Sequence, residues 1–166
     1  MGQTLTASAE PAEATASYQW KQADTASGNY TDIAGASARS YKITAKEAGK
    51  FLKVEAAGTG EYTGTVTSAA TEAVKTLVTK AAISGTAQVG QTLTASPTPS
   101  AATVTYEWQK ADSADGTYIP IAKATGKTYV LTEAENGKFI KVKLTGTGNY
   151  TGTATSDATE AVTPAE

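Results

Sequence analysis

Side chains capable of acid–base or nucleophilic catalysis are sparse in this chain, which contains neither histidine nor cysteine. Histidine is the commonest general base near neutral pH, so catalysis here would rest on carboxylates, Lys, Tyr or Ser/Thr. Two carboxylates for glycoside hydrolysis need a fixed separation across a cleft. Glu133 and Glu135 instead share one corner, and Glu47 stands without a close acidic partner. We therefore expect solvated charges at these positions and no enzyme activity.

A pair of aspartates raises the question of a calcium site. Asp112 and Asp115 offer two carboxylates to Ca²⁺, a hard cation that takes six or more oxygen ligands. The first half of the chain has Asp24 in the first position but Ser27 in the second. Two carboxylates make a weak site, and a turn of short polar side chains explains the same residues. We therefore predict no metal and no cofactor.

Two loops rich in Gly and Thr, residues 58–65 and 146–153, are the best candidates for a binding site. Each places one tyrosine at a hairpin tip among hydroxyl side chains, which suits contact with a glycan or a host surface protein. Turn formation alone is the alternative interpretation, and the presence of the loop in both halves of the chain favours it. The candidate binding residues are Tyr62, Thr63, Tyr150 and Thr151.

The composition limits the partners of this 166-residue chain. Its 14 basic and 16 acidic residues give a formal net charge of -2 without a basic stripe, so neither nucleic acid nor an anionic membrane is expected as a partner. No apolar run approaches the ~20 residues of a membrane span. The chain opens without a signal peptide and reads as a segment of a longer protein. Low charge, abundant Thr and the lack of Cys suit an extracellular bacterial protein, secreted or on the cell surface.

An internal repeat organises the chain. Gly2-Gln-Thr-Leu-Thr-Ala-Ser8 recurs at residues 90–96, an offset of 88, and about 42 of the 73 positions in 2–74 match those in 90–162. Because a repeat of this length is a domain-sized unit, we expect two domains, residues 1–76 and 77–166.

The second copy has an additional segment in front of it. Residues 75–89 have no counterpart before the first copy, and residues 81–89 read as an initial strand. We therefore expect the first domain to lack its initial strand. A sheet edge without a neighbour exposes backbone donors and acceptors, so the first domain should be less stable and more prone to self-association.

Alternation of side-chain types predicts strands around the two tryptophans. Tyr18 and Trp20, like Tyr106 and Trp108, lie two residues apart and point to one face of a strand. In the complete copy we expect about seven short strands, the first near residues 82–89, one over 91–96 that stops at Pro97, and the last over 153–162. The prediction is an all-β fold of two β-sandwich domains. The predicted structural core contains Trp20, Trp108, Tyr41, Tyr129, Val54 and Val142.

Four motifs span nearly the whole of the second copy and recur in the first. They are Val89-Gly-Gln-Thr-Leu-Thr-Ala95, Tyr106-Glu-Trp-Gln-Lys-Ala-Asp112, Thr132-x-x-x-x-Gly-Lys-Phe-Ile-Lys-Val142 and Gly146-Thr-Gly-Asn-Tyr-Thr-Gly-Thr153. Together they resemble the immunoglobulin-like (Ig-like) tandem repeats of Gram-positive bacterial surface and S-layer-associated proteins. The resemblance implies Ig-like sandwiches that serve as spacers or as adhesive modules. One departure is Phe139, which stands where the Ig corner has a tyrosine.

Three functions follow as hypotheses. The first is a non-enzymatic spacer or stalk segment of a large bacterial cell-surface protein, whose partners are neighbouring Ig-like repeats of the same chain. The second is an adhesive module that binds through the Tyr62 and Tyr150 loops. The third is a self-assembling structural subunit that uses the open edge of the first repeat. The apolar linker at residues 76–78 is expected to pack against a domain end and limit flexing.

Overall fold

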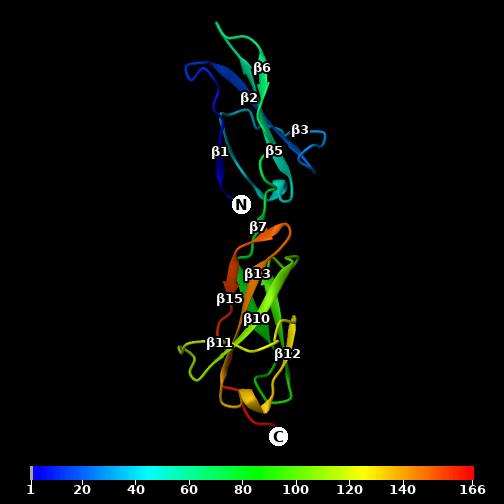
Figure 1. Cartoon of the computed structure of the whole chain (residues 1–166), viewed down its shortest axis with the longest axis vertical. Helices are drawn as coiled ribbons and strands as arrows, with labels where there is room; N and C mark the ends of the chain where they lie inside the picture. Colours follow the sequence, from blue (N-terminus) through cyan, green and yellow to red (C-terminus); the bar gives the residue numbers. More distant parts are fainter. Residues whose placement is uncertain (1) are drawn as a thin grey trace. The chain divides into compact units, whose positions relative to one another are not determined.

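The computed structural model describes residues 2–166, which form an all-β structure (Figure 1). These residues fall into two compact units that divide between Thr76 and Leu77, the boundary that the repeat predicts. We call residues 2–76 unit 1 and residues 77–166 unit 2. Among the described residues, no helix combines the length and the apolar character needed to cross a lipid bilayer.

Unit 2 has a sandwich-like architecture of two antiparallel sheets, ordered β12-β9-β8 and β11-β10-β13-β15 (Figure 1). A single 3₁₀ turn, η2 (Glu133–Glu135), precedes β13. β7 (Thr76–Leu77) lies at the junction with unit 1. The other strands are β8 (Lys80–Ser84), β9 (Thr92–Thr98), β10 (Val104–Ala111), β11 (Ile119–Pro120), β12 (Thr128–Val130), β13 (Phe139–Gly146), β14 (Tyr150–Thr151) and β15 (Thr153–Thr155).

Unit 1 repeats this arrangement with one strand fewer in the smaller sheet. Its sheets are ordered β1-β4 and β3-β2-β5-β6, and the 3₁₀ turn η1 (Ala45–Glu47) precedes β5. The strands are β1 (Thr4–Thr6), β2 (Ala16–Ala23), β3 (Thr31–Asp32), β4 (Ser40–Lys42), β5 (Phe51–Gly58) and β6 (Thr65–Thr67). At the offset of 88, β1 corresponds to β9, so no strand of residues 2–76 stands in the position of β8.

Each core is centred on its tryptophan. Trp108 is fully buried, its ring centroid lies 5.9 Å from that of Tyr129, and its Nε1–H donates to the Gly126 carbonyl at 2.9 Å. Trp20 of unit 1 stacks on Tyr41 in the same way, with the centroids 5.8 Å apart. The large indole ring therefore fills the space between the sheets while its one polar atom remains hydrogen-bonded.

The two sheets of unit 2 pack face to face around this ring. Leu93 of β9 lies in the same buried cluster as Trp108 and as Val142 of β13, which pairs with Trp108 across the ladder. In unit 1, Val54 takes the place of Val142 opposite Trp20. The alternation along β13 buries Ile140, Val142 and Leu144, and Val142 is one of the predicted core residues.

Three strand boundaries differ from the expected ones. β8 begins and ends earlier than residues 82–89, and β15 is shorter than residues 153–162. β9 does not stop at Pro97 but continues to Thr98. The reason lies in the direction of the backbone amides: the Ala95 N–H donates to Lys127, on the side away from β8. Pro97, two residues later, turns its nitrogen to that same side, so its missing N–H leaves the ladder with β8 intact.

Side chains near β8 in unit 2 are more buried than their counterparts in unit 1. Leu93 is fully buried, whereas its counterpart Leu5 is half-buried. Ser156 is buried, whereas Ser68 is exposed, and Val66 on β6 is 65% exposed. Unit 1 therefore removes less apolar surface from water than unit 2, which lowers its hydrophobic stabilisation.

Because each unit contains one tryptophan, fluorescence can follow the units separately. Trp20 reports the urea unfolding of unit 1 in a Trp108→Phe variant, and Trp108 reports unit 2 in a Trp20→Phe variant, so the observed unit is never the substituted one. We expect the unfolding free energy of unit 1 to be at least about 2 kcal/mol smaller, since more of its apolar surface stays in water. Coincident transitions, or the reverse order, would contradict this expectation.

Candidate functional site

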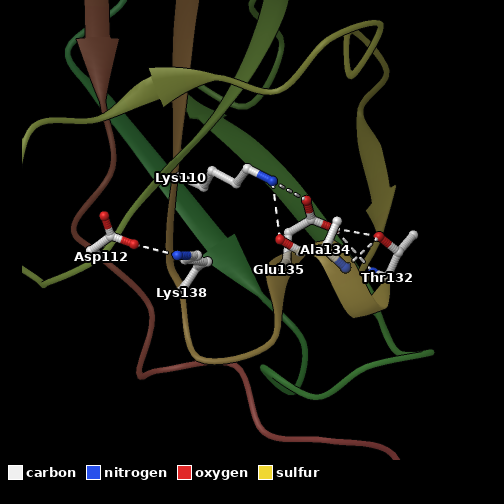
Figure 2. Close-up of polar contacts among 6 residues, drawn as sticks. All are labelled: Lys110, Asp112, Thr132, Ala134, Glu135 and Lys138. Atoms are coloured by element: carbon white, nitrogen blue, oxygen red, sulfur yellow. Dashed lines mark hydrogen bonds and ion pairs between the residues drawn. The ribbon is translucent and has the colours of Figure 1, made fainter.

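The 3₁₀ turn η2 carries a buried carboxylate. Glu135 is 1% exposed and accepts hydrogen bonds from the backbone N–H and the hydroxyl of Thr132, at 3.2 and 2.7 Å (Figure 2). The Thr132 hydroxyl oxygen accepts in turn from the Ala134 N–H at 3.3 Å. Thr132 and Glu135 thus form a capping box, in which two side chains satisfy backbone amides at the start of a helical turn.

Lys110 supplies the positive charge beside this carboxylate. Its Nζ lies 2.9 Å from Glu135 Oε1 and donates to the Ala134 carbonyl at 3.1 Å (Figure 2). Burial acts to raise the pKa of the Glu135 carboxyl, but the hydrogen bonds from Thr132 and Lys110 outweigh it and hold the pKa below its ordinary value. The ionised form therefore stabilises unit 2 above the ordinary Glu pKa of about 4.3, and this contribution is lost as the pH falls through the lowered value.

A tyrosine connects each buried carboxylate to the core. Burial, together with the neighbouring Glu135 carboxylate, raises the pKa of Tyr129 to about 12. Burial and the Glu47 carboxylate likewise raise the pKa of Tyr41 to about 12. These are the same rings that pack on the tryptophans. The corner turn and the centre of each core are therefore joined through one side chain.

Unit 1 has the same capping box without the cation. Glu47 is also 1% exposed and accepts from the Thr44 N–H and hydroxyl, both at 2.8 Å. Gln22 occupies the position of Lys110, and its buried Oε1 has no hydrogen-bond partner among residues 2–166. A buried polar atom left unsatisfied costs stability, so this corner is weaker in unit 1 than in unit 2.

The expectation of solvated glutamates is wrong for Glu47 and Glu135, because both carboxylates are buried and hydrogen-bonded within their corner. It holds for Glu133, whose side chain is exposed. The signal that identifies the buried pair was present in the sequence as Thr-x-x-Glu at residues 44–47 and 132–135. Their chemistry is that of caps, since both carboxylates accept from threonine donors and Glu135 also accepts from Lys110.

Two of the aspartates considered for calcium make ion pairs instead, and the third, Asp115, is exposed. Asp112 pairs with Lys138, as Figure 2 shows, and Asp24 pairs with Lys50 at the same place in unit 1. The hydrogen bond from Lys138 lowers the pKa of Asp112. Within residues 2–166, no group of three or more acidic, His or Cys side chains comes together that could hold a metal ion.

The Tyr62 and Tyr150 loops are anchored by their own backbones. The Gly58 N–H donates to the Gly64 carbonyl and the Gly146 N–H to the Gly152 carbonyl, each at 2.9 Å. The chain comes so close at Gly146 that a Cβ there would lie 2.7 Å from a backbone nitrogen, which explains the glycine. Both tyrosines are half-buried, while Thr63 and Thr151 are exposed.

In unit 2 this loop also holds the segment that follows the junction. The Val78 N–H donates to the Thr151 carbonyl at 2.8 Å, and Val78 is 2% exposed. A Cβ on Gly152 would lie 2.5 Å from Leu77 Cδ1, so the leucine lies directly on the glycine. The expected packing of residues 77–78 against the end of a domain is therefore present within unit 2.

Comparison with protein-family models and with curated proteins gave no match for this chain. The candidate sites therefore stand on their own geometry. That geometry brings Lys110, Thr132 and Glu135 together as a stabilising corner, and it gives Thr151 a structural partner in Val78.

Exchanging the residues at positions 110 and 22 tests the value of the corner ion pair. Lys110→Gln leaves Glu135 buried without its cation, and we expect it to lower the unfolding free energy of unit 2 by roughly 1.5 to 3 kcal/mol, the range for a hydrogen bond to a charged group. Gln22→Lys gives Glu47 the same partner and removes an unsatisfied buried oxygen, so it should stabilise unit 1 by about 1 kcal/mol. Urea unfolding followed through the tryptophan of the affected unit measures both changes.

Lys143→Gln is the matched control, because Lys143 pairs with Glu107 at 3.6 Å between side chains that are 42% and 41% exposed. An exposed pair of this kind contributes less than about 1 kcal/mol. Equal losses in Lys110→Gln and Lys143→Gln, or a destabilising Gln22→Lys, would argue against a stabilising role for the buried pair.

Proposed function

We propose that this chain is a structural spacer, two tandem Ig-like β-sandwich repeats from the stalk of a large extracellular bacterial surface protein. The order of the strands supports the Ig-like assignment: in unit 2 the chain crosses three times between a three-stranded and a four-stranded antiparallel sheet. Two of the four motifs that resemble bacterial Ig-like repeats lie on the central strands of the four-stranded sheet, β10 and β13 in unit 2 and β2 and β5 in unit 1.

The observation that carries the proposal is that each copy of the repeat closes a core of its own. The buried cluster around Trp108 draws only on unit 2, and the cluster around Trp20 only on unit 1. Modules that fold independently and follow one another along a chain suit a rod assembled from repeats. Neighbouring repeats of the same chain are then the first partners of each unit.

The polar side chains of each unit support a structural rather than a catalytic role. The two buried carboxylates, Glu47 and Glu135, accept hydrogen bonds from threonine caps. The exposed acids Asp24 and Asp112 pair with lysines across the corner. A catalytic acid or base needs free access to a substrate, and these groups are occupied by neighbours on their own unit.

A stalk segment should respond to force as two separate modules. We expect single-molecule pulling on the whole chain to give two unfolding events, each lengthening the chain by roughly 230 to 280 Å, from ~3.5 Å per unfolded residue less the folded length. The event at lower force should belong to unit 1, because its core is less covered. Lys110→Gln should lower the force of the other event and leave the first unchanged.

Two results would contradict the spacer role. One is a single cooperative unfolding event for the whole chain. The other is saturable binding to a glycan or a host surface protein that is lost when Tyr62→Ala and Tyr150→Ala are combined, with both unfolding midpoints unchanged. The second result would assign the chain to adhesive modules.

A further inference from the structure

Unit 1 has a groove beside the Tyr62 loop. It has a volume of about 230 Å³ and lies between the segment around Ala9 and Glu10 and the strand that follows the loop. Ala56 forms part of its lining, and Val66, which is 65% exposed, forms another part. Covering the apolar surface of such a half-open groove would stabilise the fold.

The same place in unit 2 is filled by residues 77–79. Val78 donates to the Thr151 carbonyl and Thr79 to the Thr98 carbonyl, both at 2.8 Å. The counterparts of these two acceptors at the offset of 88 are Thr63 and Glu10, which line the groove of unit 1. A Cβ on Gly152 would lie 2.5 Å from Leu77, whereas a Cβ on Gly64 would have nothing within 4 Å. The groove of unit 1 therefore corresponds to the place that residues 77–79 fill in unit 2, and no residue of unit 1 fills it.

The sheet edge next to the groove is open as well. In unit 2, β8 continues from this seat and pairs with β9 from Lys80 opposite Thr98 to Ser84 opposite Thr94. Ala81 of β8 is 2% exposed and belongs to the core of unit 2. In unit 1, β1 has β4 as its one neighbour among residues 2–76. The counterparts of the β9 residues that pair with β8 are residues 6–10, which begin at the last residue of β1 and pair with no strand on that side within residues 2–76. This edge is therefore able to accept a strand by main-chain hydrogen bonds.

The charge of Glu10 at this edge favours a strand that carries a lysine in the matching position. Lys80 lies directly opposite Thr98 in the register of unit 2. In unit 1 the counterpart of Thr98 is Glu10, which is exposed. A strand seated in the same register would place its lysine opposite a carboxylate, and opposite charges across a strand pair are stabilising.

We propose that this groove and edge of unit 1 form a binding site for an extended strand with the pattern of residues 77–84, Leu-Val-Thr-Lys-Ala-Ala-Ile-Ser. The valine of that strand occupies the groove, its lysine faces Glu10, and its first alanine and its isoleucine cover the part of the core that Ala81 and Ile83 cover in unit 2. The site binds by completing the smaller sheet. The inference does not depend on the stalk role, because strand binding and mechanical unfolding are separate measurements.

A labelled synthetic peptide with the sequence of residues 77–84 tests the site on the whole chain. We expect a saturable rise in fluorescence anisotropy. In the Trp108→Phe variant, the unfolding midpoint of unit 1 should rise with peptide concentration, because a ligand that binds only the folded state stabilises it. The midpoint of unit 2, read in Trp20→Phe, should stay unchanged, since unit 2 already holds this segment.

Two substitutions locate the binding. Val66→Lys places a charge in the groove and should weaken peptide binding about tenfold or more, whereas Val130→Lys, at a valine that is 53% exposed on unit 2, should have no effect. Glu10→Lys should weaken binding about two- to fivefold, the size of one cross-strand charge pair, and a peptide carrying Lys80→Glu should recover the loss. Trp20 fluorescence and circular dichroism verify that each unit 1 variant is folded.

Three results would overturn the proposal. The first is no saturable binding up to about 1 mM peptide, a limit that corresponds to a binding free energy near -4 kcal/mol. The second is binding that Val66→Lys and Glu10→Lys leave unchanged, because the peptide then lies elsewhere. The third is a dimer of the chain that Val66→Lys abolishes and the peptide does not dissociate, because a second copy then fills the groove.

Discussion

The two units differ mainly in how well one end of the smaller sheet is covered. In unit 2, β8 and residues 77–79 cover it. In unit 2, Val78 and Ala81 are buried against that end, and Leu93 and Ser156 beneath them are shielded from water. In unit 1 the same surface is bounded by an open edge, with Val66 exposed. The hydrophobic effect scales with the area removed from water, so a single strand accounts for a large part of the difference between two otherwise similar cores.

The second shared device is the link from tryptophan to tyrosine to buried carboxylate. The tryptophan fixes the tyrosine ring, and the tyrosine faces a glutamate that caps the 3₁₀ turn before the central strand. A buried carboxylate is favourable only when donors satisfy it, and unit 2 adds Lys110 to the threonine donors. Unit 1 lacks that lysine, which weakens its corner. Its sheet edge is weaker for an independent reason, the absence of a strand in the position of β8.

The sequence predicted the features that depend on local patterns. The repeat located the division at residues 76–77, and alternation around Trp108 predicted the strand β10 with its buried tryptophan. Predictions from the sequence were wrong where the structure depends on residues that are distant in the sequence. Pro97 stays within β9 because its nitrogen points away from β8, which no composition rule reveals. Glu135 was predicted to be a solvated surface charge, although Thr132, three residues earlier, indicates a capping box. The groove of unit 1 is recognised only when the surroundings of Val78 in unit 2 are compared with the equivalent residues of unit 1.

The central claim is that the segment represented by residues 77–89 completes the sandwich, and fusing that sequence directly before Gly2 tests it most directly. The measurement is the urea unfolding free energy of unit 1, read from Trp20 in the Trp108→Phe background. If the segment covers the open end, this free energy rises by about 2 kcal/mol or more, toward the value of unit 2. An unchanged free energy would mean that the extra strand does not close the core and would contradict the account.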